Sequence, residues 1–191
     1  MLYRSFAQKS RIVDDYPSSN LIIKKSIFNE IGGYNCKYWP GEDTKLCHDI
    51  SYVLEEKLLY HPSIKVYHQK RNFPKQHLTQ LNRYATHRGF YVKYLPRTSR
   101  LPIYFIPSLL SIYLTLLIPL YLIKLHFNLL NYIIWLPLFS YIFVLTLNSI
   151  WVRKNHQSDL LALLSIPVVV ISHFSYGIFF LIGLLKKDLK K

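Results

Sequence analysis

The sequence predicts an α/β head followed by a helical membrane anchor, and two observations support this fold class. Charge divides the chain near residue 100, because residues 1–100 hold 17 Lys/Arg and 8 Asp/Glu whereas residues 101–191 hold 7 and 2. Hydropathy divides it at the same place, since short apolar runs alternate with helical patterns in the head and long uncharged runs follow it. We therefore expect a head at 1–73, a juxtamembrane amphipathic helix at 74–100 and an anchor at 101–191.

The elements of the head are predicted from local patterns of apolar and turn-forming residues. Strands are expected at 18–23 and over 58–68, and helices at 26–31, from 42 onward and at 75–93. Ser26 can cap the first helix, and Gly32-Gly33 can end it because glycine tolerates a positive φ. In the second helix Leu46 and Ile50 recur at helical spacing, with charged residues on the other face. Pro96 is expected to end the third helix just before the membrane.

The anchor is predicted from three uncharged apolar segments, at 101–123, 127–151 and 160–185. Each is long enough to cross a bilayer, which takes roughly 20 helical residues. Three crossings would leave the two ends of the chain on opposite sides and the C-terminal lysines outside, against the tendency of Lys and Arg to stay on the cytoplasmic side. If the first segment, with its three prolines, lies in the interface or re-enters, two crossings result. The sequence leaves both arrangements open.

The compartment is predicted from the first residues and the cysteines. The first ten residues are polar and basic, so no signal peptide opens the chain. Cys36 and Cys47 are too few for a disulfide framework and indicate free thiols in a reducing compartment. We therefore expect a multi-pass protein of the cell membrane with a cytoplasmic head. Its net charge of +14 favours contact with membrane lipids, and no nucleic-acid partner is expected because the basic residues are interleaved with acids.

Two groups of residues in the head could carry chemistry. Glu42 and Asp43 are adjacent acids at a predicted helix start, where one carboxylate could act as the general base toward an acceptor hydroxyl. Acids in a first turn also complement the helix dipole without any catalytic role. Gln80, Arg83 and Tyr84 share one helical face and offer an amide, a guanidinium and an aromatic ring, a set suited to a diphosphate and a sugar. The same face could instead lie on lipid headgroups.

Taken in order along the chain, a series of short motifs resembles the C-terminal half of the family-2 glycosyltransferase domain. The motifs are Ser19-Asn20, Ile31-Gly32-Gly33-Tyr34, the run from Trp39-Pro40-Gly41-Glu42-Asp43 to Cys47, Tyr60-His61-Pro62, Val66-Tyr67-His68, Gln80–Tyr84 and His87-Arg88-Gly89. A looser match to polysaccharide-assembly members of the family follows at His173–Gly177. The resemblance covers residues 17–185, which is most of the chain.

The resemblance implies a fold, a reaction and roles for particular residues. Residues 1–73 would be an α/β remnant of a GT-A (nucleotide-diphospho-sugar transferase) domain, followed by transmembrane helices. Asp43 would be the catalytic base with Glu42 as its partner, and Gln80, Arg83 and Tyr84 would contact the donor diphosphate and the acceptor. The reaction would move a sugar from a nucleotide-sugar donor to a hydroxyl acceptor, expected to be lipid-linked, in cell-surface polysaccharide or glycolipid synthesis. Tyr84 stands where the family often has Trp, which suits enzymes that add one sugar at a time.

The family also implies a part that this sequence does not contain. A divalent metal (Mg or Mn) is normally held on the diphosphate by an Asp-x-Asp motif, and the chain has none; Asp14-Asp15 lacks the preceding hydrophobic strand. The histidines show no metal-ligand spacing, so no metal ligand is expected in this chain. We expect the nucleotide-binding half on a lost segment or a second chain, and little activity without it. The alternative is a non-catalytic membrane anchor or assembly subunit whose basic head docks on lipid or on a protein.

Overall fold

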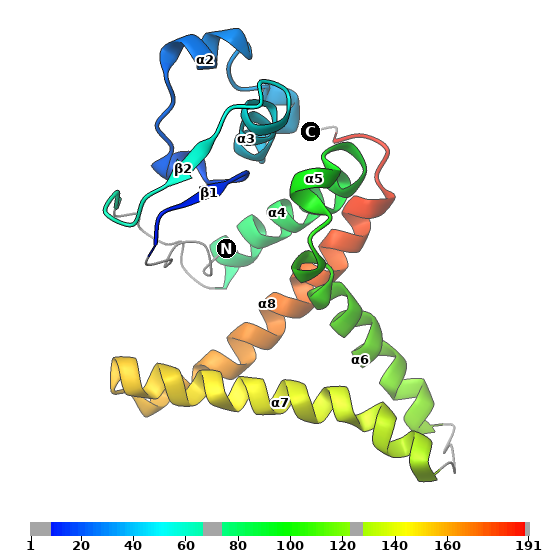
Figure 1. The fold of residues 1–191 in the computed structure, drawn as a ribbon. Coiled ribbons are helices and arrows are strands. Elements are labelled where there is room, and N and C mark those ends of the chain that lie inside the picture. The colour runs from blue at the N-terminus through cyan, green and yellow to red at the C-terminus, as the bar shows by residue number, and fades with distance from the viewer. Residues whose placement is uncertain (1–8, 67–73, 123–127, 190–191) are drawn as a thin grey trace. The chain divides into compact units, whose positions relative to one another are not determined.

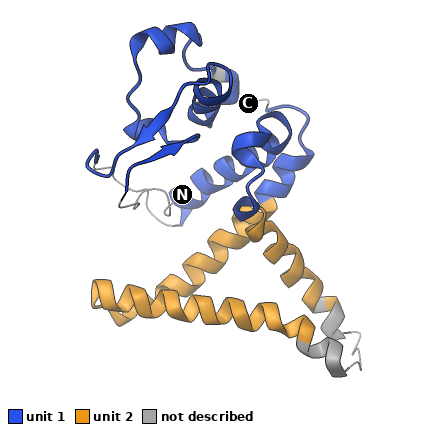
Figure 2. Cartoon of the chain, viewed as in Figure 1, with its two compact units in different colours: residues 1–104, 179–191 blue, residues 105–178 orange. Residues whose placement is uncertain are grey.

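The computed structural model describes residues 9–66, 74–122 and 128–189, which form two compact units (Figures 1 and 2). Unit 1 comprises residues 1–104 and 179–191, and unit 2 comprises residues 105–178. The elements of unit 1 are β1 (Arg11–Val13), α2 (Lys25–Glu30), α3 (Glu42–Tyr52), β2 (Leu58–Tyr60), α4 (Lys75–Tyr94) and α5 (Pro96–Ser99), with 3₁₀ turns at Ser18–Asn20, Cys36–Tyr38 and Pro102–Tyr104. Helices α6 (Ile106–Leu122), α7 (Asn128–His156) and α8 (Asp159–Leu185) follow, and the last residues of α8 belong to unit 1.

The predicted α/β remnant of a GT-A domain is wrong, because the described chain is mainly helical. Its strands are the three-residue β1 and β2, which pair antiparallel in the register Arg11↔Tyr60, Ile12↔Leu59 and Val13↔Leu58. The strand expected at 18–23 is instead a 3₁₀ turn followed by an irregular segment in which Ile22 is 83% exposed. Residues 64–66 form no strand, and 67–68, the rest of that prediction, lie outside the described residues.

The helices predicted in the head are confirmed. α2 ends where expected, with Gly32 and Gly33 at φ 79° and 76°, although Lys24 rather than Ser26 occupies the N-cap. α3 begins at Glu42 and buries Leu46, Cys47 and Ile50, which form a small core with Leu58 of β2. α4 ends at Tyr94, and Pro96 then starts α5 as its first residue, a position that proline tolerates.

The C-terminal end of α8 packs directly on α4 within unit 1. A Cβ added to Gly183 would lie 2.0 Å from the Thr86 carbonyl oxygen, and one added to Gly89 would lie 2.1 Å from the Phe180 carbonyl oxygen. The two backbones are therefore in contact, which only glycine allows at both positions. Beyond α8, the Lys93 ammonium donates a hydrogen bond to the Lys186 carbonyl at 2.7 Å.

Unit 2 contains long apolar helices joined by hydrogen bonds from small and polar side chains. Ser108 of α6 donates to the Gly177 carbonyl of α8 at 3.1 Å, where a Cβ on Gly177 would lie 2.4 Å from the Pro107 carbonyl oxygen. Ser149 of α7 donates to the Ala162 carbonyl of α8 at 2.8 Å. Small residues at helix crossings and hydrogen bonds between helices are typical of association in membranes.

Two helices in the described part of the chain are long and apolar enough to cross a membrane. They span Ile133–His156 and Asp159–Leu185, and only 6% and 17% of their most apolar stretches are buried by protein. The core helix of a soluble protein would be covered, whereas here large side chains such as Phe143 and Leu163 are exposed. The first predicted segment, 101–123, forms a shorter apolar helix of 17 residues, α6, which contains Pro119.

Candidate functional site

The two acids at the start of α3 both bind backbone amides. Asp43 is 8% exposed; its Oδ1 accepts a hydrogen bond from the Thr44 amide at 2.8 Å and its Oδ2 accepts one from the Ser18 amide at 3.3 Å. Glu42 is half-buried and its Oε2 accepts a hydrogen bond from the Gly41 amide at 2.8 Å. The two acids in the first turn therefore stabilise the start of α3, because they accept hydrogen bonds from backbone amides and complement the helix dipole.

Burial changes the proton affinity of Asp43. Desolvation raises the pKa of this carboxyl group, and the nearby charges of Asp15 and Glu42 raise it further. The hydrogen bonds from the Ser18 and Thr44 amides lower the pKa but do not reverse the shift. A carboxylate with a raised pKa takes up a proton more readily, which is the property that a general base needs.

Gly41 fixes the acidic turn against α4. Its φ is 143°, in the region that side chains rarely adopt, and an added Cβ would lie 2.6 Å from the Tyr91 hydroxyl oxygen. Tyr91 is 1% exposed and its hydroxyl donates a hydrogen bond to the Tyr38 carbonyl at 2.7 Å, so the ring has little room to move. Glycine is thus required here both by backbone conformation and by close approach.

The loop before Gly41 rests on the exposed side of α4. The Arg83 guanidinium carbon lies 5.7 Å from the centroid of the Trp39 ring, within cation–π range. One turn further, His87 Nε2 lies 3.1 Å from the Trp39 carbonyl oxygen and its Nδ1 lies 2.8 Å from the Arg83 carbonyl oxygen. Burial lowers the pKa of His87. The loop that contains Trp39 and the part of α4 that contains Arg83 and His87, which lie about 40 residues apart in the sequence, are thereby brought together.

A buried ion pair joins four segments of the head. The Arg88 Nη2 lies 2.9 Å from Asp15 Oδ2, and the side chains are only 12% and 9% exposed. Thr44 completes the group, since its hydroxyl donates to Asp15 Oδ1 at 3.0 Å. The Arg88 Nη1 also reaches the Ser99 hydroxyl at 3.4 Å, and its guanidinium stacks over the Tyr104 ring at 4.6 Å. Residues before α2, in α3, in α4 and in the segment Pro96–Tyr104 therefore share one charged centre.

The structure unites part of the predicted site. Asp43, Glu42 and Arg83 belong to the docked loop and the helix beneath it. Gln80 and Tyr84 lie half-buried on α4 beside Arg83, but in the described chain they make no hydrogen bond to the acidic turn. Asp15 and Arg88 were not predicted. Arg88 stands in the His87-Arg88-Gly89 motif of the resemblance, which assigns it no role, and among the small and apolar residues Ala85, Gly89 and Val92, at a spacing that faces the protein.

The described residues do not fit the divalent metal that the resemblance implies. Within 9–66, 74–122 and 128–189, no three His, Cys, Asp or Glu side chains come together as ligands for an ion. His68, together with Lys70 and Arg71, lies outside the described residues. No catalytic step is therefore assigned to a metal held by these residues.

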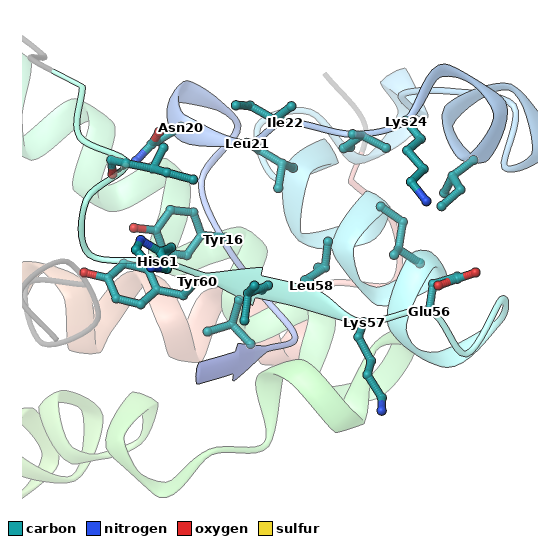
Figure 3. Close-up of a pocket in the computed structure, with 16 residues that line it drawn as sticks. Tyr16, Asn20, Leu21, Ile22, Lys24, Glu56, Lys57, Leu58, Tyr60 and His61 are labelled. Carbon is teal, nitrogen blue, oxygen red and sulfur yellow. Dashed lines mark hydrogen bonds between the residues drawn. The ribbon is translucent and has the colours of Figure 1, made fainter. Parts of the chain in front are cut away.

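A cavity of about 310 Å³ lies beside the small head core, and Ile50 and Leu58 of that core line it (Figure 3). Its apolar floor includes Leu21 and Leu58. The aromatic rings of Tyr16 and Tyr60 lie at one end, with centroids 5.8 Å apart, and Lys57 lies toward the other. Asp43 and Arg83 do not line this cavity, which is therefore separate from the acidic turn.

Comparison with protein-family models, with curated proteins and with solved structures found no match for this chain. Its function must therefore be argued from its own residues.

Proposed function

We infer that this chain is the membrane-anchored, acceptor-side part of a sugar transferase, with Asp43 as the base. The observation that carries this inference is the docking of the Trp39–Asp43 loop on α4, which holds the loop that ends in a carboxylate of raised pKa against the helix that bears Arg83. Such a pair suits transfer between a hydroxyl and a diphosphate donor, because one group takes up a proton while the other attracts the anion that leaves. The motif order from Gly32 to Gly89 adds support by its resemblance to family-2 glycosyltransferases.

In the proposed reaction the acceptor hydroxyl attacks the anomeric carbon of the sugar. The new C–O bond forms as the hydroxyl proton passes to the Asp43 carboxylate, and the bond from the anomeric carbon to the diphosphate oxygen breaks with its electron pair going to the diphosphate. Gln80, Arg83 and Tyr84 are proposed to contact the diphosphate and the acceptor. Glu42 would hold the turn through the Gly41 amide. The donor nucleotide would be bound by a second chain or a further segment.

The proposed location is the cell membrane, with the head on the cytoplasmic side. The contacts of Gly89 with Phe180 and of Gly183 with Thr86 tie the end of α8 to the head. Residue 104 and the end of α8 must then lie on the same side of the bilayer, which requires an even number of crossings between residues 104 and 185. Helices α7 and α8 supply two crossings, and α6 is proposed not to cross. The lysines after α8 then lie with the basic head, as the distribution of positive charge in membrane proteins favours.

This topology is tested by cysteines introduced singly at Gln157, between α7 and α8, and at Lys187. A membrane-impermeant maleimide should label the cysteine at 157 in intact cells, and the cysteine at 187 only after permeabilisation. Labelling of the cysteine at 187 but not of the cysteine at 157 in intact cells is the pattern that three crossings produce, and it would contradict an even number of crossings.

The catalytic proposal is tested in the cells that make this protein. After deletion of the chain, membranes are incubated with labelled nucleotide sugars, and labelled lipid is measured with wild-type protein, Asp43→Asn or the exposed control Glu55→Gln restored. Wild type and Glu55→Gln should restore the labelled product, and Asp43→Asn should lower it by 10²-fold or more, on the order that general-base catalysis contributes. Full restoration by Asp43→Asn would overturn the role of this carboxylate.

A second candidate is a non-catalytic anchor or assembly subunit. It is favoured by the engagement of both acids with backbone amides, since Asp43 and Glu42 each have a structural partner in their own turn. Under this reading the deletion removes the labelled product, and Asp43→Asn restores it.

A further inference from the structure

Five exposed basic side chains lie at the end of α4, in and just after α5, and just after α8. These junction cations are Lys93, Arg97, Arg100, Lys186 and Lys187. Asp188 is the exposed acid among them. The charges of Lys186 and Glu42 both act on the His87 ring. Positive charge therefore exceeds negative charge at this junction.

Contacts within unit 1 hold the residues after α8 in place. Besides the bond from Lys93 to the Lys186 carbonyl at 2.7 Å, the Tyr94 hydroxyl donates to the Lys187 carbonyl at 3.3 Å. Leu189 then packs on the buried cluster that contains Phe90. Because the carbonyl groups make these contacts, the side chains of Lys186 and Lys187 remain exposed.

The two arginines are held at the same junction by α4 and α3. The Arg100 Nε donates a hydrogen bond to the Val92 carbonyl at 3.0 Å, which leaves its other guanidinium N–H groups for a ligand. The Arg97 guanidinium carbon lies 5.0 Å from the centroid of the Tyr52 ring. A guanidinium binds two phosphate oxygens at once through paired N–H groups, whereas the ammonium group of a lysine acts as a point charge.

Each end of this cationic surface continues into exposed apolar side chains. Leu185, directly before Lys186, is 83% exposed, and Ile103, three residues after Arg100, is 61% exposed. Leu185 is also the last residue of the apolar helix α8, so the cations begin where a crossing helix leaves hydrocarbon for the headgroup layer. The surface thus changes from apolar to cationic in the way that a phospholipid changes from acyl chain to phosphate.

We propose that the junction cations bind the phosphate groups of anionic phospholipids in the leaflet that faces the head. The arrangement favours a lipid over a nucleic acid, because a nucleic acid presents no apolar chains beside its charge. It favours a lipid over an acidic protein because Lys186 and Lys187 directly follow a helix long and apolar enough to cross a membrane. The inference rests on the proposed topology and is independent of sugar transfer. Its consequence is a head held at the membrane surface by α4, α5 and α8 together.

The test measures binding of phosphatidylglycerol with a fluorescent tail to the full chain in neutral detergent micelles, followed by anisotropy. Unlabelled phosphatidylglycerol should displace the probe, and phosphatidylcholine should not. Added salt should weaken binding, since exposed charges are screened. The double variant Lys186→Gln/Lys187→Gln should bind about 25-fold more weakly, at roughly fivefold for each basic residue near an anionic surface.

The matched control is Lys24→Gln/Lys57→Gln, which removes two exposed lysines beside the cavity of Figure 3 and the same net charge. The control should bind the probe like wild type. Equal displacement by phosphatidylcholine, unchanged affinity in the Lys186/Lys187 variant, or the same loss in the control would each overturn the proposal. Because no sugar donor is present, the outcome does not depend on whether the chain is a transferase.

Discussion

The crossing of α4 and α8 gives the sharpest quantitative prediction, through Gly183→Ala. The added methyl group would sit 2.0 Å from the Thr86 carbonyl oxygen and 2.8 Å from the carbonyl carbon. Real Cβ atoms essentially never approach another heavy atom closer than 3.0 Å, so the two backbones must separate by about 1 Å. A backbone carbonyl in a helix cannot rotate away, so the strain cannot be relieved by a change of rotamer.

The expected cost follows from two opposing effects. Overpacking of a tight contact costs up to about 3 kcal/mol. Replacing glycine by alanine within a helix returns up to about 1 kcal/mol through backbone entropy. The difference, about 2 kcal/mol of unfolding free energy, corresponds to a fall in Tm of roughly 8 °C for a unit the size of unit 1.

Cys47 supplies a reporter for this measurement. Its thiol is fully buried in the head core, and burial raises its pKa to about 12, so it should resist alkylation until the head unfolds. In a Cys36→Ala background, a thiol-reactive fluorophore therefore reports unfolding of unit 1 during heating in detergent. The hydrogen-exchange rates of the backbone amides over 179–189 report the packing of α8 on α4 directly.

The control for Gly183→Ala is Ile182→Ala on the same helix, whose side chain is 41% exposed. Its Tm should stay within about 4 °C of wild type, as expected for a surface position. An unchanged Tm and unchanged exchange in Gly183→Ala would refute the backbone contact between α4 and α8.

Three further changes test the head. Arg88→Met removes the cation that pairs with the buried Asp15 carboxylate and should cost about 3–5 kcal/mol of unfolding free energy. The exposed control Arg97→Met should cost at most about 1 kcal/mol. Equal losses in thermal melts would contradict the buried pair. Gly41→Ala should cost about 1–3 kcal/mol, because the left-handed conformation is strained for alanine, and denaturant titration that shows no loss would exclude this strain. Burial raises the Asp43 pKa above its ordinary value of 3.8, so the protonated carboxyl adds stability that is present at low pH and is lost as pH rises through the raised pKa. The Tm of wild type relative to Asp43→Asn should therefore fall as pH is raised from about 4 to 7, and a constant difference would argue against a raised pKa.

The helices were predictable because their signal is local. In α3 and α4 the apolar residues recur at helical spacing within one continuous segment, and Gly32-Gly33 mark the end of α2. The strands were predictable only in part. β2 at Leu58–Tyr60 lies within the predicted strand region 58–68, whereas a run such as Leu21–Ile23 has the same local pattern whether or not a neighbour pairs with it. β1 was missed because three residues that include Arg11 carry almost no pattern of their own.

The candidate site was predictable only in its parts. The sequence indicated Asp43 and Arg83 separately, but the contact that joins their segments depends on Trp39 packing on α4, 44 residues away. The pair of Asp15 and Arg88 spans 73 residues and has no local signature beyond an arginine among small side chains. Such long-range contacts arise from the packing of whole elements, which the pattern in one segment does not specify.

The backbone contact between α4 and α8 at Gly89 and Gly183 also affects how the protein is made. Thr86 and Gly89 leave the ribosome long before Phe180 and Gly183, because the whole of unit 2 lies between them in the chain. Domains usually fold as they are synthesised, N-terminal part first. Here α4 has to wait, with its α8-facing backbone uncovered, until α6, α7 and α8 have been synthesised. Completion of the head is thus coupled in time to synthesis of the last helix, and a chain arrested before residue 180 should present an unfinished head to chaperones and proteases.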